Sequence, residues 1–162
     1  MATKTRKSGR SLHFFANPAR FLRFARKFFP WVAILAAVCI VAALVLGLGV
    51  VPPDSLQGDA YRIIFVHVPA SWMALMIYVI MALASAAGFI WRHPLADLVA
   101  KSSAPIGACF TLISLVTGSL WGKPMWGTWW VWDARLTSVL VLLFLYLGFI
   151  VLSNAFDSTM RG

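Results

Sequence analysis

Long uninterrupted stretches of apolar residues dominate the pattern along this chain. Four of them are long enough to cross a ~30 Å hydrocarbon layer, which takes about 20 residues of helix. They cover residues 31–51, 68–91, 102–121 and 136–156. The pattern therefore predicts an all-α integral membrane protein, with four transmembrane helices in one membrane domain over residues 31–156.

The charged positions gather outside these stretches and predict the orientation of the chain. Eight of the fourteen Lys and Arg lie in residues 1–27, and no acidic residue accompanies them. Such a flank stays in the cytoplasm, so we expect the N-terminal segment, residues 1–30, to be cytoplasmic. Four spans return the tail, residues 157–162, to the same side. The loops 52–67 and 121–135 are then expected to face the periplasm, across a bacterial inner membrane.

The basic N-terminal segment is predicted to have two parts. Residues 1–16 are polar and basic, which favours disorder. Asn17 and Pro18 are typical of a helix start, and the following residues to Phe29 alternate aromatic and basic side chains. We expect a short interfacial helix that lies on anionic lipid and anchors the topology.

Composition narrows the class of protein further. The chain is 61% apolar and 12% charged, against ~25% charged residues in a soluble domain. The net charge of +9 is concentrated beside the first span, so it indicates membrane lipid and no nucleic acid as the partner. Cys39 and Cys109 lie inside spans without a CxxC motif, which favours buried, reduced thiols and argues against haem attachment to this chain's own cysteines.

A tryptophan-rich stretch, WGKPMWGTWWVWDARLT, separates the last two spans at residues 121–137 and holds five of the eight tryptophans. If it is helical, Trp126, Trp130, Asp133 and Thr137 share an arc of about 60°. An aromatic belt, a platform for docking a protein, and a surface for a large planar ligand are all compatible with it. For a planar ligand with carboxylates, the tryptophans would contact the ring and the neighbouring charged residues its edge.

His67 is the one ionisable residue of the second apolar stretch, on the same expected side as the tryptophans. Pro69 follows it and suits the first turn of a helix, so we expect His67 just ahead of a helix N-terminus. The helix dipole would then disfavour the imidazolium and leave the neutral, metal-binding form. A hydrogen-bonded interfacial histidine is the alternative interpretation, and an axial ligand to haem iron is the functional one.

The stretch at 121–137, with Arg62, His67-Val68-Pro69 and Trp72, resembles the WWD signature of the haem exporter protein C family, also called cytochrome c maturation protein C. The resemblance covers about residues 31–156. It implies haem b, held transiently and without covalent attachment at the periplasmic face, with His67 as an axial ligand. The implied ring contacts are Trp121, Trp126, Trp129, Trp130 and Trp132, and the implied propionate or polar contacts are Lys123, Asp133, Arg135 and Arg62.

The resemblance also implies a role and partners. A protein of this kind works beside ATP-binding-cassette subunits and a small single-span subunit, and it delivers haem to a periplasmic haem chaperone during cytochrome c biogenesis, without being an enzyme. Two alternatives stay open: a cytochrome c synthetase component of the same superfamily, and a non-haem scaffold subunit of a transporter that uses the tryptophans for docking.

The sequence departs from the family pattern in one respect. That pattern has six spans and a second outer histidine between the last two, whereas this sequence ends at Gly162 after the fourth. His13 and His93 are both expected on the cytoplasmic side. We therefore do not expect a bis-histidine site within this sequence: either it is a fragment, or the sixth ligand comes from water, from a partner or from nothing.

Overall fold

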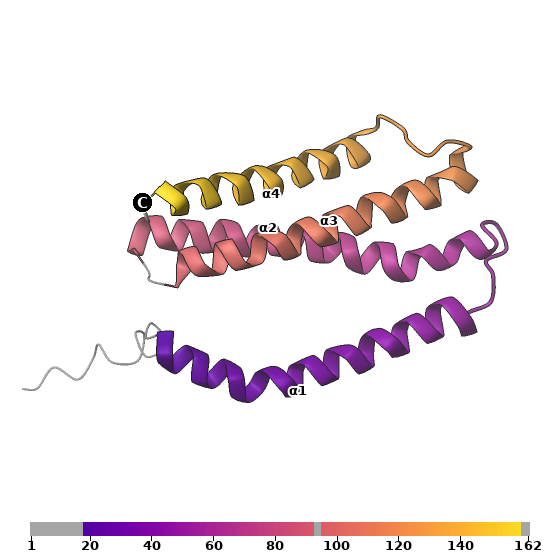
Figure 1. Cartoon of the computed structure of the whole chain (residues 1–162). Helices are drawn as coiled ribbons and strands as arrows, with labels where there is room; N and C mark the ends of the chain where they lie inside the picture. The colour runs from indigo at the N-terminus through magenta and orange to yellow at the C-terminus, as the bar shows by residue number, and fades with distance from the viewer. Residues whose placement is uncertain (1–17, 93–94, 160–162) are drawn as a thin grey trace, which may run out of the picture.

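The computed structural model describes residues 18–92 and 95–159, and it is built from helices and loops (Figure 1). The predicted disorder of residues 1–16, together with His13, His93 and residues 160–162, lies outside the described residues. The elements are α1 (Pro18–Leu44), the π-helical turn η1 (Val45–Val50), the 3-10 helix η2 (Asp59–Ile63), α2 (Ile64–Trp91), α3 (Ala96–Trp126) and α4 (Ala134–Thr159). In the described part, four helical segments are long and apolar enough to span a membrane, as predicted.

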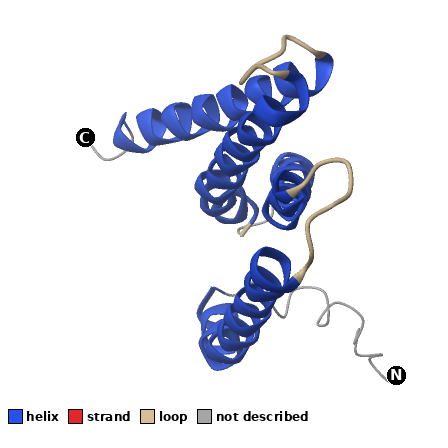
Figure 2. Cartoon of the chain, turned by 90° about the vertical axis from the view of Figure 1, so that its right-hand side faces the viewer, coloured by secondary structure: helices blue, strands red, loops and turns tan. Residues whose placement is uncertain are grey.

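Helix α3 lies between α2 and α4, and the three form one bundle, while α1 stands apart from them (Figures 1 and 2). The π-helical turn η1, which continues α1, contacts the bundle where Gly47 packs against the ring of Phe65. The loops 51–58 and 127–133 lie at this same end of the molecule. This end carries the site described below.

Small side chains let α2 and α3 approach closely, as the alanines Ala70, Ala74, Ala104 and Ala108 are all buried. Tyr146 of α4 completes this core, with 2% of its surface exposed. Its hydroxyl donates to the backbone carbonyl of Ala74 at 2.7 Å, which fastens α4 to α2 across α3. The bundle is therefore held by close backbone packing together with one buried hydrogen bond between its outer helices.

Two helix boundaries differ from those expected. The predicted interfacial helix is not separate, because α1 continues through Pro30 into the first span. Helices in membranes tolerate such prolines where the freed carbonyl is satisfied by other groups. Likewise α2 begins at Ile64, directly after η2, so His67 lies inside its first turn and Pro69 inside the helix. The expectation that His67 precedes the helix is wrong.

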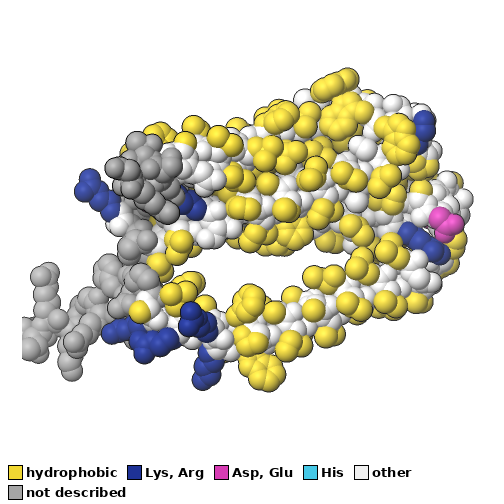
Figure 3. Space-filling model, in the orientation of Figure 1, with side chains coloured by type: hydrophobic (Ala, Val, Ile, Leu, Met, Phe, Trp, Pro, Cys, Tyr) yellow, Lys and Arg dark blue, Asp and Glu magenta, His cyan; other side chains and the backbone are white. Residues whose placement is uncertain are grey.

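Apolar side chains cover the sides of the molecule, and charged ones gather at its two ends (Figure 3). Trp31 and Phe89 are among the large apolar residues exposed on the helix surfaces. Cys39 and Cys109 are free, as expected, but they lie exposed on these surfaces, so the prediction of buried thiols is wrong. A surface of this kind suits a multi-pass membrane protein, whose lipid-facing residues have no reason to be buried in the chain.

Candidate functional site

The tryptophan-rich stretch does not form the expected surface helix. Helix α3 ends at Trp126, and Gly127 follows in the left-handed region with φ 74°, its N–H donating to the carbonyl of Lys123 at 3.0 Å. Glycine adopts this conformation without a Cβ clash, so it ends the helix. Residues 127–133 form a loop, and the predicted common face of Trp126, Trp130, Asp133 and Thr137 is wrong.

The loop nevertheless brings two parts of the stretch back together. Asp133 caps α4, as its Oδ1 accepts the N–H of Leu136 at 2.8 Å. Its Oδ2 accepts from Arg135, from Nε at 3.1 Å and from Nη2 at 3.0 Å. The guanidinium lies 5.6 Å from the ring centre of Trp126. Asp133 thus fixes where α4 starts and, through the ion pair, where the guanidinium of Arg135 lies.

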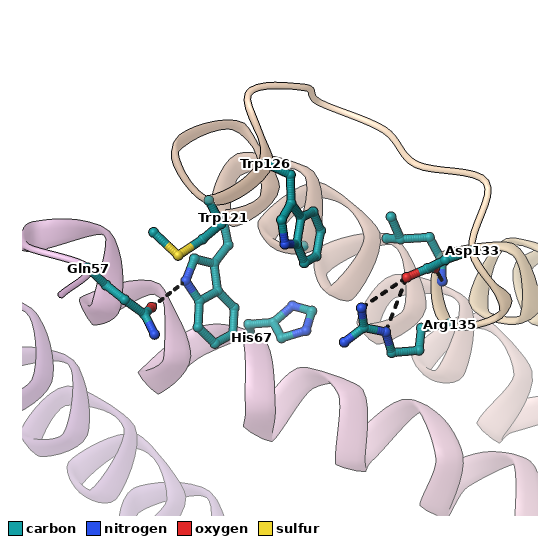
Figure 4. A pocket seen from close by; sticks show the side chains of 9 residues that line it. Gln57, His67, Trp121, Trp126, Asp133 and Arg135 are labelled. Carbon is teal, nitrogen blue, oxygen red and sulfur yellow. Dashed lines mark hydrogen bonds and ion pairs between the residues drawn. The ribbon is translucent and has the colours of Figure 1, made fainter.

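Between these elements lies a pocket of about 330 Å³, a size typical of a small-molecule site. Its lining combines aromatic, apolar and a few polar side chains, from the loop before η2, from the loop before α4, and from α2, α3 and α4. The lining residues are Gln57, His67, Gly118, Trp121, Met125, Trp126, Asp133, Arg135 and Leu136. Figure 4 shows His67 in the middle, with Trp121 on one side, Arg135 on the other and Trp126 above.

The imidazole of His67 is fixed from three directions. Its Nδ1 lies 3.0 Å from the hydroxyl oxygen of Thr117 on α3. The indole of Trp121 meets the ring at 70°, with 5.8 Å between the ring centres. Gly118 leaves room for it, because a Cβ there would lie 3.2 Å from Cε1 of His67. The ring therefore has one defined position at the pocket wall.

Gln57 holds Trp121 in place, and sequence reasoning did not find it. The indole N–H of Trp121 donates to Oε1 of Gln57 at 2.9 Å (Figure 4). Gln57 is positioned by Asp54, whose Oδ1 accepts the backbone N–H groups of Leu56 and Gln57, both at 2.9 Å. These hydrogen bonds, first that of Gln57, hold the pKa of the Asp54 carboxyl below its usual value.

The charge of Asp133 is stabilised in the same way. The pKa of its carboxyl lies below the usual value, chiefly because the backbone N–H of Leu136 donates to it, and further because Arg135 donates to it. Asp133 is therefore ionised at neutral pH and balances the guanidinium beside it. Pocket polarity at this edge comes from an ion pair and not from an isolated cation.

Two of the predicted polar contacts lie away from the pocket. Arg62 donates from Nη1 to the carbonyl of Leu48 at 2.9 Å and pairs with Asp59 at 3.5 Å, so it ties η1 to η2. Lys123 donates to the carbonyl of Gly127 at 3.1 Å and lies 5.7 Å from the ring centre of Trp129. Both cations therefore donate to backbone carbonyls and do not line the pocket.

Three of the five tryptophans also lie outside the pocket lining. Trp129 and Trp132 are 55% and 77% exposed. Trp130 packs edge-on against Trp132, with 5.5 Å between ring centres, and its indole N–H is buried without a partner among the described residues. Of the predicted ring contacts, the structure thus brings Trp121 and Trp126 to His67.

Comparison with known proteins now decides the family. A sequence model of the family described as "Heme exporter protein C" matches residues 11–162. Proteins of that name are similar over most of the chain: the one from Escherichia coli (strain K12) is 53% identical over 148 residues, and that from Bradyrhizobium diazoefficiens 49% over 147. The chain belongs to the haem exporter protein C family.

The extent of the match differs between the chain and these family members. It covers 91% of this chain in both cases, but 60% of the Escherichia coli protein and 56% of the Bradyrhizobium protein. The Haemophilus influenzae protein, 47% identical, gives a similar picture, with 93% of this chain and 61% of its own length. The chain thus spans about 60% of the length of the curated relatives it matches.

Within this family frame, the pocket offers one nitrogen ligand and aromatic walls. Among residues 18–92 and 95–159, no three His, Cys, Asp or Glu side chains group closely enough to hold a metal ion. His67 alone would give one coordination position, which suits a metal whose other positions a ring already fills. Four lining residues were not predicted from the sequence, and they shape the pocket wall: Gln57, Gly118, Met125 and Leu136. Of these residues, Gly118 carried a sequence signal, because a glycine in an apolar helix indicates where another side chain approaches closely, here that of His67.

Proposed function

We propose that this chain binds haem b without covalent attachment in the pocket around His67, and delivers it to a periplasmic haem chaperone during cytochrome c biogenesis. The single observation that carries the proposal is the imidazole at an aromatic wall. Nδ1 of His67 is engaged by Thr117 and the ring lines the pocket, which leaves Nε2 as the nitrogen for a ligand. A neutral imidazole with one free nitrogen is the ligand that haem iron takes from proteins.

The other lining residues fit the rest of such a ligand. Trp121 and Trp126 offer flat apolar faces for a porphyrin. Arg135 spends only Nε and Nη2 on Asp133, so its Nη1 is left to donate to a carboxylate at the ring edge. Gln57 spends its oxygen on Trp121, which leaves its amide N–H groups for the same use. Lys123 and Arg62 would reach the ligand only if the loops moved.

The orientation follows from the basic N-terminal flank. The Lys and Arg of residues 1–27 favour a cytoplasmic N-terminus, and the loops 51–58 and 127–133, which contribute to the pocket, lie at the other end of the molecule from the start of α1 (Figure 1). The site then faces the periplasm of the inner membrane. The exposed rings of Trp129 and Trp132 beside the pocket give the chaperone a surface to dock on.

A handling role suits the side chains present. The pocket supplies a ligand, apolar walls and an ion pair, which bind and orient haem, and we assign it no catalytic step of its own. ATP-binding-cassette subunits and a small single-span subunit are the partners that we propose at the membrane. A partner, water or further chain would supply the second axial ligand, since His67 is the only histidine among the described residues.

The test is the absorption spectrum of the protein purified from haem-replete cells. We expect a Soret band in the parent, and in His67→Ala a large loss of that band, restored at least in part by added imidazole. Trp121→Ala should weaken haem retention. Leu56→Ala is the matched control, because Leu56 lies next to Gln57 in the loop before η2, is 92% exposed and lies outside the pocket lining.

Two outcomes would contradict the proposal. A parent without a Soret band after growth with haem would exclude haem binding by this chain. A band that is unchanged in His67→Ala would exclude His67 as the ligand. If instead Trp132→Ala abolishes co-purification with the chaperone while no variant shows any haem band, the alternative of a docking scaffold is favoured.

A further inference from the structure

We infer that Thr117 is a positioning residue, which holds His67 in the tautomer that carries its proton on Nδ1 and so presents a bare Nε2 to the pocket. The effect of this tautomer on haem binding rests on the proposed function, but the tautomer itself is a property of the protein without haem. Thr117 lies on α3, fifty residues along the chain from His67, and is absent from the pocket lining.

The direction of the hydrogen bond follows from counting protons. The hydroxyl of Thr117 has one proton, and its oxygen lies 2.7 Å from the carbonyl oxygen of Ile113 and 3.2 Å from that of Ser114. Carbonyl oxygens accept only, so the proton of Thr117 belongs to the short contact with Ile113. Toward His67, at 3.0 Å, the hydroxyl oxygen can then only accept.

The opposite arrangement is less favourable. If the hydroxyl donated to Nδ1, two oxygens would face each other at 2.7 Å with no proton between them, and one hydrogen bond would be lost. With Nδ1 protonated, both contacts are hydrogen bonds, and the only ring nitrogen with a lone pair is Nε2. The hydrogen bond of the ring with the Thr117 side chain is at Nδ1, so the lone pair of Nε2 is left for a metal.

The same contact fixes the rotation of the ring. Gly118, next to Thr117, admits Cε1 of His67 against α3, and Trp121, one turn further, closes the side of the ring. Three residues on two consecutive turns of one helix thus define how the imidazole lies. A hydrogen bond on the second nitrogen of a ligating histidine orients the ring and raises its basicity, and its loss costs about 10–100-fold in metal affinity.

The first experiment uses the protein without haem. Nitrogen NMR of ¹⁵N-histidine-labelled protein in lipid distinguishes the two neutral tautomers, and His67→Gln assigns the signal among the three histidines. We expect Nδ1–H in the parent and in Thr117→Ser, and a mixture or Nε2–H in Thr117→Val. Thr111→Val is the matched control, because the Thr111 hydroxyl also donates to a carbonyl four residues back on α3, at 2.7 Å.

The second experiment uses the haem-loaded protein. Thr117→Val should lower the iron–histidine stretching frequency, raise the midpoint potential because the ligand is less basic, and weaken haem retention by about 10–100-fold. Thr117→Ser should restore all three values. The inference fails if Thr117→Val matches Thr111→Val in tautomer, frequency and potential while His67→Ala still loses haem. Failure of the proposed function looks different, since the parent itself would then bind no haem.

Discussion

Replacing Gly107 by alanine is expected to weaken the contact that sets α4 against the bundle. Gly107 of α3 lies directly under the ring of Tyr146, where an added Cβ would clash with Cε1, Cζ and the hydroxyl. The ring cannot easily retreat, because it is buried and its hydroxyl donates to the carbonyl of Ala74 at 2.7 Å. Since α4 begins with the residues that complete the pocket, this contact also bears on the site.

The expected magnitude combines three effects. Overpacking a filled core costs about 1–3 kcal/mol, and breaking the Tyr146 hydrogen bond would add about 1 kcal/mol. Alanine regains up to ~1 kcal/mol of helix propensity over glycine. We therefore expect Gly107→Ala to lower the free energy of unfolding by about 1–3 kcal/mol. Gly148→Ala on α4 is the control, because its Cβ would meet nothing within 4 Å, and it should be neutral or slightly stabilising.

The assay is reversible unfolding in mixed micelles with increasing SDS, followed by tryptophan fluorescence. A double-mutant cycle with Tyr146→Leu isolates the clash, since Gly107→Ala should cost little once the ring is absent. The reasoning would be refuted if Gly107→Ala and Gly148→Ala were equally stable. It would be refuted as well if the cost of Gly107→Ala were the same with leucine at position 146.

Three further predictions concern the pocket and its rim. Gln57→Leu removes the acceptor of the Trp121 indole N–H, so we expect a shifted and more quenchable Trp121 emission, measured against Trp121→Phe, and weaker haem retention. Because the pKa of Asp133 is lowered in the folded state, its charged cap stabilises the fold above the usual carboxyl pKa of 3.8, and this contribution is lost as the pH falls through the lowered value. Asp133→Asn should therefore make the free energy of unfolding less dependent on pH in the acid range. An unchanged pH dependence in the variant would count against the cap. Trp126→Ala should reduce haem retention more than Trp132→Ala, since of these two residues Trp126 alone lines the pocket, and the reverse order in spectra normalised to protein would place the ligand on the outer rim.

Sequence patterns were sufficient to predict the features that depend on residues close together in the sequence. Four apolar stretches of spanning length predict four helices, because the hydrocarbon layer imposes a length that composition alone reveals. The density of tryptophans and the position of His67 predicted that they share one end of the molecule, and the structure places Trp121 and Trp126 beside His67. The helix end at Gly127 was also readable in principle, since glycine is the residue that most often stops a helix, but the periodicity of the tryptophans favoured a continuous helix.

The sequence by itself determined the membrane class and the number of long helices, and it supplied candidate residues for a haem site, which stay predictions. Only the tertiary structure decided which of those residues meet. Gln57 and Trp121 are 64 residues apart, and His67 and Thr117 are 50 apart, so their contacts depend on how closely α2 and α3 pack. The close packing of α2 and α3 comes from small residues, which let the two backbones approach each other. The periodicity of one helix does not show which side chain of the other helix will fit beside a given small residue.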